Sequence, residues 1–384
     1  MSFTICDHDL CCGCALCADV CPHGAIRITR DVHGFARPEI DPSLCVGCGA
    51  CRAKCPVNCE NESRAEKVYA AYAKDKEIRR KSSSGGIFRL LANKTLEDGG
   101  AVAAVGYDGK FHALYKVTDR PEGLDEMMGS KYTEALSDGI YGKVKTLLSD
   151  GKKVLFVGTP CRVAALKSFV GDRENLLAVD FICHGVPSPV LLEKFLSENF
   201  GKDIERVSFR DKTRGWQEFS MRVDEAGKKP YINSQYKDPY LRVFLCNTAL
   251  RESCYDCRFK AEHYASDITL GDFWGISSCI PSMNDDGGTS AVVIRSAKGS
   301  SAFDEIKYFL VLKETSPETL GKANIALNKS SLKPAARGDM LLALERGDTF
   351  SAIAEKFGRP APSRAIISER MKRSVKKILG KIKK

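Results

Sequence analysis

The sequence predicts a protein of mixed α+β and α/β class, in which a small cysteine-rich unit precedes a larger mixed α/β body and a basic C-terminal helix. Three observations support this prediction. A cysteine run occurs twice between Cys11 and Pro56. Strand-like and helix-like segments alternate beyond residue 67, which favours an α/β core. The segment from Arg364 to Lys384 contains nine basic residues and one acidic residue.

We expect four regions along the chain. The cysteine-rich unit takes residues 1–60, and the polar stretch that follows reads as a linker. The body divides into a first part at residues 67–150 and a second part at residues 151–315. Residues 316–384 form a helical extension and the basic tail. A chain of 384 residues has room for this number of units.

Composition narrows the class of protein. Hydrophobic residues make up 43% of the sequence, which is enough for an ordinary buried core, and the formal net charge is +10. Most of that charge lies in the tail, so we do not expect a nucleic-acid-binding protein. The first ten residues lack a signal-peptide apolar core, and no apolar run is long enough to span a bilayer. We therefore expect a cytoplasmic protein, in which thiols stay reduced.

The two cysteine runs share one spacing. Each run has three cysteines separated by two residues, and a fourth after three more residues that is followed by proline. This spacing is similar to that of bacterial two-cluster ferredoxins, in which the fourth cysteine of each run ligates the cluster of the other run. We therefore expect a two-cluster ferredoxin domain. One [4Fe–4S] cluster is assigned to Cys11, Cys14, Cys17 and Cys55, and the other to Cys45, Cys48, Cys51 and Cys21.

Glycines beside these cysteines suit a cluster loop. Gly13, Gly47 and Gly49 have no Cβ, so the backbone can approach a cluster closely. The alternatives are zinc sites, for which CxxC pairs alone would serve, and disulfides. Eight cysteines in two identical runs favour clusters over both. Five further cysteines lie outside ligand spacing, and we expect ordinary free thiols at Cys6, Cys12, Cys59, Cys246 and Cys279.

A serine- and glycine-rich loop opens the body. Ser82, Ser83, Ser84, Gly85 and Gly86 precede a helix-like segment that ends at Gly99 and Gly100. Small residues at a helix N-terminus can form an anion site, because the free N–H groups and the positive end of the dipole face the ligand. Phosphate binding and a simple helix cap both fit this local sequence.

The rest of the body reads as alternating elements. We expect a helix from Ile87, and further helices at Asp138–Leu148, Arg162–Phe169, Val190–Phe200 and Ala302–Leu312. The expected strands are Val68–Ala73, Ala101–Gly106, Ala113–Val117, Val154–Val157, Leu176–Ile182, Val207–Arg210, Phe219–Val223 and Thr289–Arg295.

Several ordered motifs between about residues 67 and 302 resemble the beta-subunit family of coenzyme F420-reducing hydrogenases and dehydrogenases. They are SSGGI from Ser83, SKYT from Ser130, GTPCRVAALK from Gly158, the strand that ends at Cys183, Cys254-x2-Cys257, and SDITLGDFWGI from Ser266.

The resemblance implies an iron–sulfur flavoprotein with FAD and a third [4Fe–4S] cluster in the body. It assigns that cluster to Cys161, Cys183, Cys254 and Cys257. It raises the expectation of a flavin phosphate at Ser83, Ser84, Gly85 and Gly86. It also places Lys131, Tyr132, Asp267, Thr269 and Gly271 in the flavin pocket.

The expected function is that of an oxidoreductase. Electrons from a one-electron donor such as ferredoxin would pass through the clusters to FAD, and then as hydride to an organic acceptor. Phe273–Gly275 resembles bacterial members of the family. That leaves the acceptor open between an F420-like deazaflavin and another reducible metabolite, including one of surface-polysaccharide synthesis. The alternative function is a non-enzymatic electron-transfer adaptor for a partner enzyme. His184 and Asp272 adjoin the motifs as candidate acids, and a homo-oligomer is left open.

The tail has a helical apolar stripe. Met371, Val375, Ile378 and Ile382 follow Ile367 at steps of four, four, three and four, and lysines and arginines crowd the other faces. We expect a solvated terminal helix. The alternative is peripheral contact with an anionic inner-membrane surface.

Overall fold

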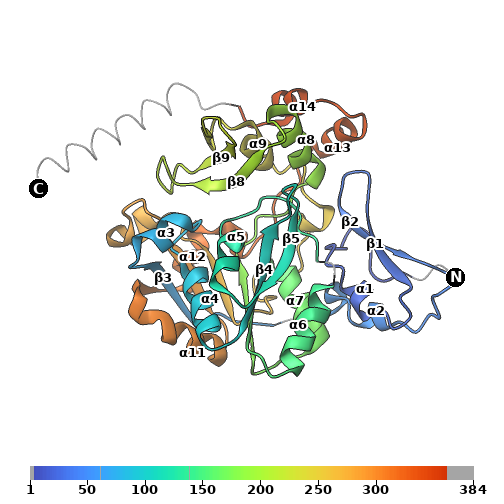
Figure 1. Cartoon of the computed structure of the whole chain (residues 1–384), viewed down its shortest axis with the longest axis horizontal. Helices are drawn as coiled ribbons and strands as arrows, with labels where there is room; N and C mark the ends of the chain where they lie inside the picture. Colours follow the sequence, from blue (N-terminus) through green and yellow to red (C-terminus); the bar gives the residue numbers. More distant parts are fainter. Residues whose placement is uncertain (1–3, 61, 138, 361–384) are drawn as a thin grey trace, which may run out of the picture.

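A mixed sheet of eight strands organises the body of the chain in this computed structural model, which describes residues 4–360 apart from 61 and 138 (Figure 1). The strand order is β13-β3-β12-β11-β7-β6-β4-β5. The strands are β3 (Lys67–Ala73), β4 (Ala101–Tyr107), β5 (Ala113–Thr118), β6 (Val154–Gly158), β7 (Leu176–Phe181), β11 (Ile268–Asp272), β12 (Ser290–Ile294) and β13 (Leu310–Thr315). Neighbours among β4, β6, β7 and β11 pair in parallel, so their carboxyl ends share one edge of the sheet.

Helices cover both faces of this sheet, which explains its nearly continuous apolar strands. Successive side chains of a strand point to opposite faces. Val102 and Leu155 pack with the helices of one face, and Ala103 and Phe156 pack with those of the other. The first face is covered by α4 (Ile87–Glu97), α5 (Leu124–Met127) and α11 (Ala297–Ile306). The second is covered by α6 (Ile140–Ser149), α7 (Pro160–Val170), α10 (Ile276–Cys279) and α12 (Pro317–Ala323).

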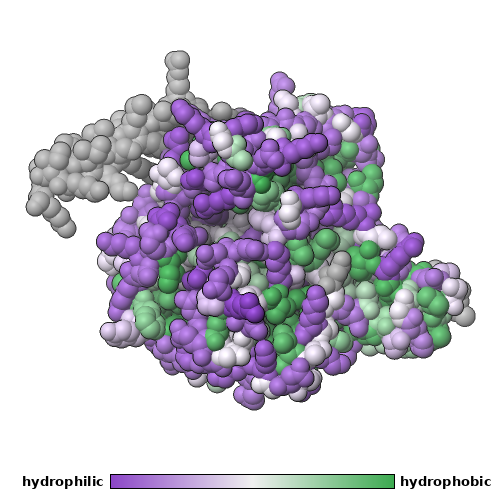
Figure 2. Space-filling view, in the orientation of Figure 1, coloured by the Kyte–Doolittle hydropathy of each residue, from purple (hydrophilic) through white to green (hydrophobic). Residues whose placement is uncertain are grey.

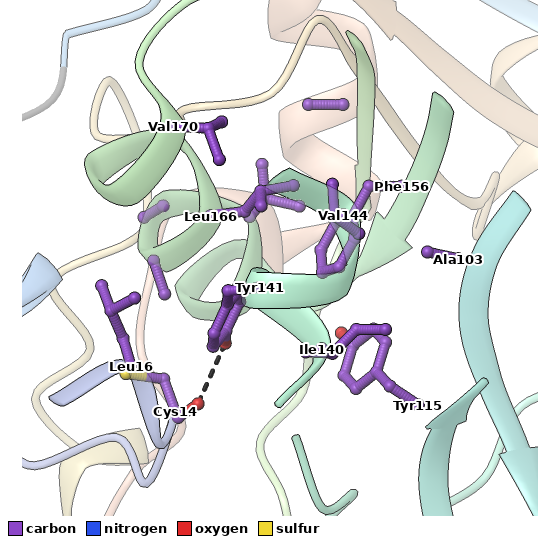
Figure 3. Close-up of a cluster of buried hydrophobic side chains, with 14 of the residues drawn as sticks. Cys14, Leu16, Ala103, Tyr115, Ile140, Tyr141, Val144, Phe156, Leu166 and Val170 are labelled. Carbon is purple, nitrogen blue, oxygen red and sulfur yellow. Dashed lines mark hydrogen bonds between the residues drawn. The ribbon is translucent and has the colours of Figure 1, made fainter. Parts of the chain in front are cut away.

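The cysteine-rich unit, residues 4–60, packs against α6 and α7 of the second face. Its apolar residues, including Leu16, belong to the same buried cluster as Val144 of α6 and Leu166 of α7 (Figure 3). The hydroxyl of Tyr141 donates to the carbonyl of Cys14 at 3.0 Å. The elements of the unit are α1 (Leu16–Val20), β1 (Ile26–Arg30), β2 (Ala36–Ile40) and α2 (Ala50–Ala53).

A buried group of three charged side chains joins this unit to the body, and we call it the anchor cluster: Glu134, Arg162 and Arg251. All three are at most 5% exposed. Glu134 accepts from Nε of Arg251 at 3.0 Å. Its Oε1 also forms ion pairs with Nη2 of Arg251 at 2.9 Å and with Nη2 of Arg162 at 3.7 Å. The backbone of the unit completes the cluster, because Ala36 N donates to Glu134 at 2.9 Å and Arg251 donates to the carbonyl of Cys11 at 2.9 Å.

A second lobe lies above the carboxyl edge of the sheet in Figure 1. A separate buried cluster holds it together, with Phe195, Phe209, Tyr240 and Phe350 at its centre. Its elements are α8 (Pro189–Asn199), β8 (Ile204–Asp211), β9 (Ser220–Glu225), β10 (Tyr231–Ser234), α9 (Pro239–Phe244), α13 (Arg337–Glu345) and α14 (Phe350–Phe357). The three strands form a small antiparallel sheet in the order β10-β9-β8.

One expected helix is partly wrong. The sequence predicts a helix over Ala302–Leu312, but α11 ends at Ile306 and β13 begins at Leu310. Leu310–Thr315 pairs with β3 as the edge strand of the sheet, so tertiary pairing overrides the local helical pattern there. Helix α3 (Lys76–Lys81) was not expected, and Asp75 caps it by accepting from the backbone N–H groups of Glu77 and Ile78.

Within the described residues, no helix combines the length and the apolar character that crossing a bilayer requires. The expected basic helix from Ile367 to Lys384 lies outside the residues that the structure describes.

Gly13 and Gly47 occupy equivalent positions in the two cysteine runs and give a matched test of the anchor cluster. Both have positive φ, at +64° and +70°, so alanine is strained at either site. A Cβ on Gly13 would also lie 2.4 Å from Nη2 of Arg251 and 2.7 Å from Oε1 of Glu134, whereas a Cβ on Gly47 would meet nothing within 4 Å. We predict that Gly13→Ala lowers the melting temperature more than Gly47→Ala and exposes the junction near residue 60 to proteolysis. Equal melting temperatures and digestion patterns would contradict this role.

Candidate functional site

The structure brings both predicted ferredoxin quartets together, each around its own cavity. Cys11, Cys14, Cys17 and Cys55 line the first cavity, within the cysteine-rich unit. Cys21, Cys45, Cys48 and Cys51 line the second. In each case the fourth cysteine comes from the other run, as the crossed assignment expects.

The cysteines are unpaired with one another in this structure. All seventeen cysteines lie among the described residues, and all are free thiols. In the part of the chain that the structure describes, no three His, Cys, Asp or Glu side chains converge on the position of a single metal ion.

The two cavities differ in their exposure. Cys14 and Cys55 of the first are 7% and 8% exposed, whereas Cys48 of the second is an exposed residue. Leu44 and Val46, in the loop of the second cavity, are 50% and 64% exposed. Figure 2 shows hydrophobic residues at the surface of the cysteine-rich unit, at the right of the view. The second cavity thus faces solvent, and the first faces the body.

A large cleft lies between the carboxyl edge of the central sheet and the second lobe. Its volume is about 1470 Å³, which exceeds the roughly 300–1,000 Å³ of an ordinary small-molecule site. Its lining comes from the ends of β6, β7 and β11, from the loop before α4, and from the second lobe. Ligands of open α/β sheets bind at this edge, because the connections that leave the strands there form a crevice.

Two cysteines of the predicted third quartet line this cleft. Cys161 follows β6 in the first turn of α7, and Cys183 follows β7. Cys254 lies beside this loop, because its sulfur accepts from the backbone N–H of Val186 at 3.5 Å.

The remaining members of the third quartet are close enough to influence one another electrostatically. Burial raises the pKa of Cys254, and the neighbouring thiolates of Cys183, Cys257 and Cys161 raise it further. Burial also raises the pKa of Cys257 to about 12, with Cys161 and Cys183 adding to the effect. The four thiols thus lie within electrostatic range of one another, although nearly 100 residues separate the first from the last in the sequence.

Two cysteines that we expected to be ordinary thiols lie inside the sites. Cys6 lines the first cavity beside Cys11 and Cys55. Cys12 lines both the first cavity and the cleft. The Cys12 thiol interacts with Cys14 on one side and Cys161 on the other. The contact with Cys14 and burial raise the pKa of Cys12, and the contact with Cys161 opposes them. No ligand spacing marks either residue, so the sequence carried no signal for them.

The serine and glycine loop lies in the cleft at the start of α4. Ser83 Oγ accepts from the backbone N–H of Ser130 at 2.8 Å, which joins the first two motifs of the sequence. Ser84 Oγ is buried, and it has no hydrogen-bond partner among the described residues. Gly85 lies against the sheet, where a Cβ would lie 2.4 Å from the carbonyl oxygen of Ala71. A residue without a Cβ is therefore required at position 85 for the loop to pack against the strands.

The other expected flavin-pocket residues divide into two groups. Tyr132 and Gly271 line the cleft. Lys131 also lines it, but its ammonium donates to the carbonyls of residues 126–129, and burial lowers its pKa to about 7. Asp267 lies at the amino end of β11, the opposite edge of the sheet, where its carboxylate accepts from Ala178 N and Ser296 Oγ at 2.8 Å. Thr269 is fully buried and accepts from Nε of Arg295 at 2.7 Å.

Sequence reasoning gave no role to Arg210, Lys212 and Trp216, which form a polar and aromatic group with Asp272 and Trp274 on the second-lobe side of the cleft. The carboxylate of Asp272 accepts from Nη1 and Nη2 of Arg210 at 2.5 and 3.0 Å, and from Nε1 of Trp216 at 2.7 Å. Trp216 in turn stacks on Trp274, with ring centroids 5.1 Å apart. The ammonium of Lys212 donates to the carbonyl of Ser84 at 2.6 Å and so holds the serine loop. The second lobe is therefore tied to the floor of the cleft.

The candidate acids have different surroundings. Three donors occupy the carboxylate of Asp272, as described above, so its role is to hold Arg210 and Trp216 in place. His184 hydrogen bonds through Nε2 to Asn247 Oδ1 at 2.5 Å, and burial lowers its pKa. Asp180, at the end of β7, also lines the cleft, and burial raises its pKa to about 6. Asp180 can therefore hold a proton nearer to neutral pH than an ordinary aspartate does.

The body of the chain and its cysteine-rich unit each match known protein families. Residues 68–138 match the N-terminal family of the coenzyme F420 hydrogenase/dehydrogenase beta subunit, and residues 151–319 match the family that describes the C terminus of the same beta subunit. Residues 10–59 match a 4Fe-4S dicluster domain. No curated protein matches the sequence. A solved chain of the xenon-derivatised F420-reducing [NiFe] hydrogenase complex from Methanosarcina barkeri is 18% identical, with a TM-score of 0.47 over 78% of this chain and 97% of that chain.

The two beta-subunit matches together cover more than half of the chain and confirm the resemblance drawn from its motifs. The chain therefore belongs to the coenzyme F420 hydrogenase/dehydrogenase beta-subunit family, as an iron–sulfur electron-transfer member with a 4Fe-4S dicluster domain.

Proposed function

We propose that this protein is an iron–sulfur flavoprotein oxidoreductase. It takes single electrons from a donor protein such as a ferredoxin, and it reduces an organic acceptor in the large cleft. The observation that carries this proposal is the shared lining of that cleft. Cys161 and Cys183 of the third quartet, the serine loop before α4, and Cys12 of the cysteine-rich unit all line it.

The cysteine quartets fit iron clusters in their chemistry. Thiolate sulfur is the ligand that [4Fe–4S] clusters require. In the third quartet, burial and mutual repulsion both oppose four thiolates without a cation. A bound iron cluster supplies the positive charge that this group needs. We assign the three clusters to the three quartets as the sequence predicted them.

The serine loop fits a flavin phosphate. Helix α4 has eleven residues and begins directly after Gly86, so its first N–H groups face the cleft end of the loop. Ser84 Oγ offers a buried hydroxyl without a partner at the same place. A phosphate oxygen of FAD would satisfy both. We therefore place the pyrophosphate beside Ser83, Ser84 and Gly86, with Gly85 holding the loop on the sheet.

The cofactors determine what the residues must do. When bound, [4Fe–4S] clusters carry single electrons, and a flavin converts them into two-electron hydride chemistry. Tyr132, Gly271 and the Arg210–Asp272 pair line the space beside the loop and would position the flavin and its acceptor. Asp180 would hold the proton that accompanies reduction. The exposed second cavity, with Cys48 and the apolar Val46, is where the donor protein would dock.

The volume of the cleft leaves room for an acceptor beside the flavin. A coenzyme F420-like deazaflavin and another reducible metabolite are both compatible with that volume. The adaptor alternative, in which the protein only relays electrons to a partner enzyme, makes a different prediction, because it requires no flavin.

Iron content tests the cluster assignment. We predict about twelve irons per chain after anaerobic reconstitution, from three four-iron clusters. Changing both Cys254 and Cys257 to serine should remove about four irons and leave the ferredoxin signals intact. The double variant Cys246→Ser and Cys279→Ser is the matched control, because neither residue lines the three sites, and it should keep the full iron content. Full iron in the first variant would disprove the third site.

Flavin binding tests the serine loop and separates the enzyme from the adaptor. We predict one FAD per chain, and a dissociation constant at least about tenfold higher in Ser84→Ala, because a hydroxyl donor to a charged phosphate is lost. Ser278→Ala is the control, since Ser278 lines the cleft but is exposed. Flavin fluorescence titration measures both. A wild-type protein that holds its iron but binds no flavin would favour the adaptor.

A further inference from the structure

Buried positive charges follow the route from the first cavity to the third quartet. Arg251 is 1% exposed, and its guanidinium donates to the carbonyl of Cys11 at 2.9 Å. Arg162 is 5% exposed and lies beside Cys161, with Nη1 3.4 Å from the carbonyl of Cys12. Lys260 is 7% exposed, and its ammonium donates to the carbonyl of Cys183. Each cation therefore contacts the backbone of a predicted cluster ligand or of its immediate neighbour.

Buried negative charge along this route is smaller. Glu134 is shared between Arg251 and Arg162, so the anchor cluster keeps one net positive charge. Asp180 lies near Cys183, but the positive charge of Arg295 acts on its carboxylate. Arg37, near Cys11, is paired with Asp31 at 3.1 Å. The net charge of the buried side chains around the first and third quartets is therefore positive.

The second cavity has no counterpart to these charges. Neither cavity has a Lys, Arg, Asp or Glu in its immediate lining. The difference lies just behind the lining: Arg251 donates to the carbonyl of Cys11, whereas among the described residues no cationic side chain hydrogen bonds to a cysteine of the second quartet. The second cavity is instead open to solvent at Cys48. The two ends of the expected electron path thus differ in kind: one is solvated, and the other is buried among cations.

This difference bears on reduction potential. Adding an electron to a cysteine-ligated cluster increases its negative charge, and burial in a low dielectric opposes that change. A nearby buried cation favours the reduced form, because its field is weakly screened. Without the cations, the first and third clusters would be harder to reduce than the exposed second cluster, and an electron would stay at the surface.

We propose that Arg162, Arg251 and Lys260 are positioning residues that raise the reduction potentials of the clusters held by the first and third quartets. Electrons that enter at the exposed second quartet then move inward toward the cleft. Each transfer oxidises one cluster by one electron and reduces the next by one, and the donor protein supplies the electron. This inference rests on the proposed cluster assignment and adds the direction of flow.

The test is an EPR-monitored redox titration of the full-length, reconstituted protein and its single variants. Lys260→Gln should lower the potential of the third cluster, so that its reduced-to-oxidised ratio at a fixed potential falls about tenfold, equivalent to about 59 mV for one electron. Lys260→Arg keeps the positive charge and should keep the potential of the third cluster at its wild-type value. Arg162→Gln should lower the potentials of the first and third clusters, and Glu134→Gln should raise them. The variant that lacks Cys254 and Cys257 assigns the signal of the third cluster.

The directions of the potential shifts separate an electrostatic role of these residues from a structural one. If the side chains acted only through packing, Glu134→Gln and Arg162→Gln would shift the cluster potentials in the same direction or release iron. Arg27→Gln is the control, because Arg27 is an exposed surface residue with 80% side-chain exposure, and it should move no potential. Full iron with unchanged potentials in Lys260→Gln would overturn this inference and leave the cluster assignment standing. Wild-type iron far below twelve would instead overturn the assignment itself.

Discussion

The buried ion pair between Glu134 and Arg251 sets the distance between the cysteine-rich unit and the cleft. Arg251, which follows the second lobe in the chain, donates to the carbonyls of Cys11 and Ala36. Glu134 accepts a hydrogen bond from the backbone N–H of Ala36. A buried ion pair is worth little unless further hydrogen bonds satisfy its remaining atoms. Here the backbone of the cysteine-rich unit supplies those bonds, so the unit must be in place for the pair to be stable. The first cavity is consequently a fixed part of the body and is not carried on a flexible tether.

The parallel strands explain why so many chemical groups meet in one cleft. β6, β7 and β11 end at the same edge of the sheet, and a cysteine or an aspartate lies at the end of each strand or just beyond it. Cys161 and Cys183 are therefore brought together by the pairing of β6 with β7. The second lobe closes the space above this edge, and Arg210 and Trp216 tie it to Asp272. The cleft is thus a consequence of the sheet, and its second wall comes from an insertion between β7 and β11.

Much of the architecture was predictable because it is written in local patterns. The cysteine spacing predicted both ferredoxin quartets, and apolar runs predicted most strands of the central sheet. Local patterns failed where long-range contacts decide the outcome. Leu310–Thr315 becomes a strand because β3 offers it an edge. Asp267 and Thr269 belong to the SDITLGDFWGI motif, but neither lies in the cleft. Asp267 precedes the amino end of β11, at the edge of the sheet opposite the cleft, and the side chain of Thr269 is buried. The contact of Cys12 with Cys161, and the pairing of Glu134 with Arg251 across 117 residues, have no sequence signal at all.

The central claim is that one chain holds three iron clusters, with the third beside the cleft. The most direct measurement is an anomalous difference map at the iron edge, from an anaerobic crystal of the reconstituted full-length protein. We expect three strong peaks: one amid Cys11, Cys14, Cys17 and Cys55, one amid Cys21, Cys45, Cys48 and Cys51, and one where Cys161 and Cys183 meet Cys254 and Cys257. Two peaks confined to the cysteine-rich unit, with none beside the cleft, would contradict that claim.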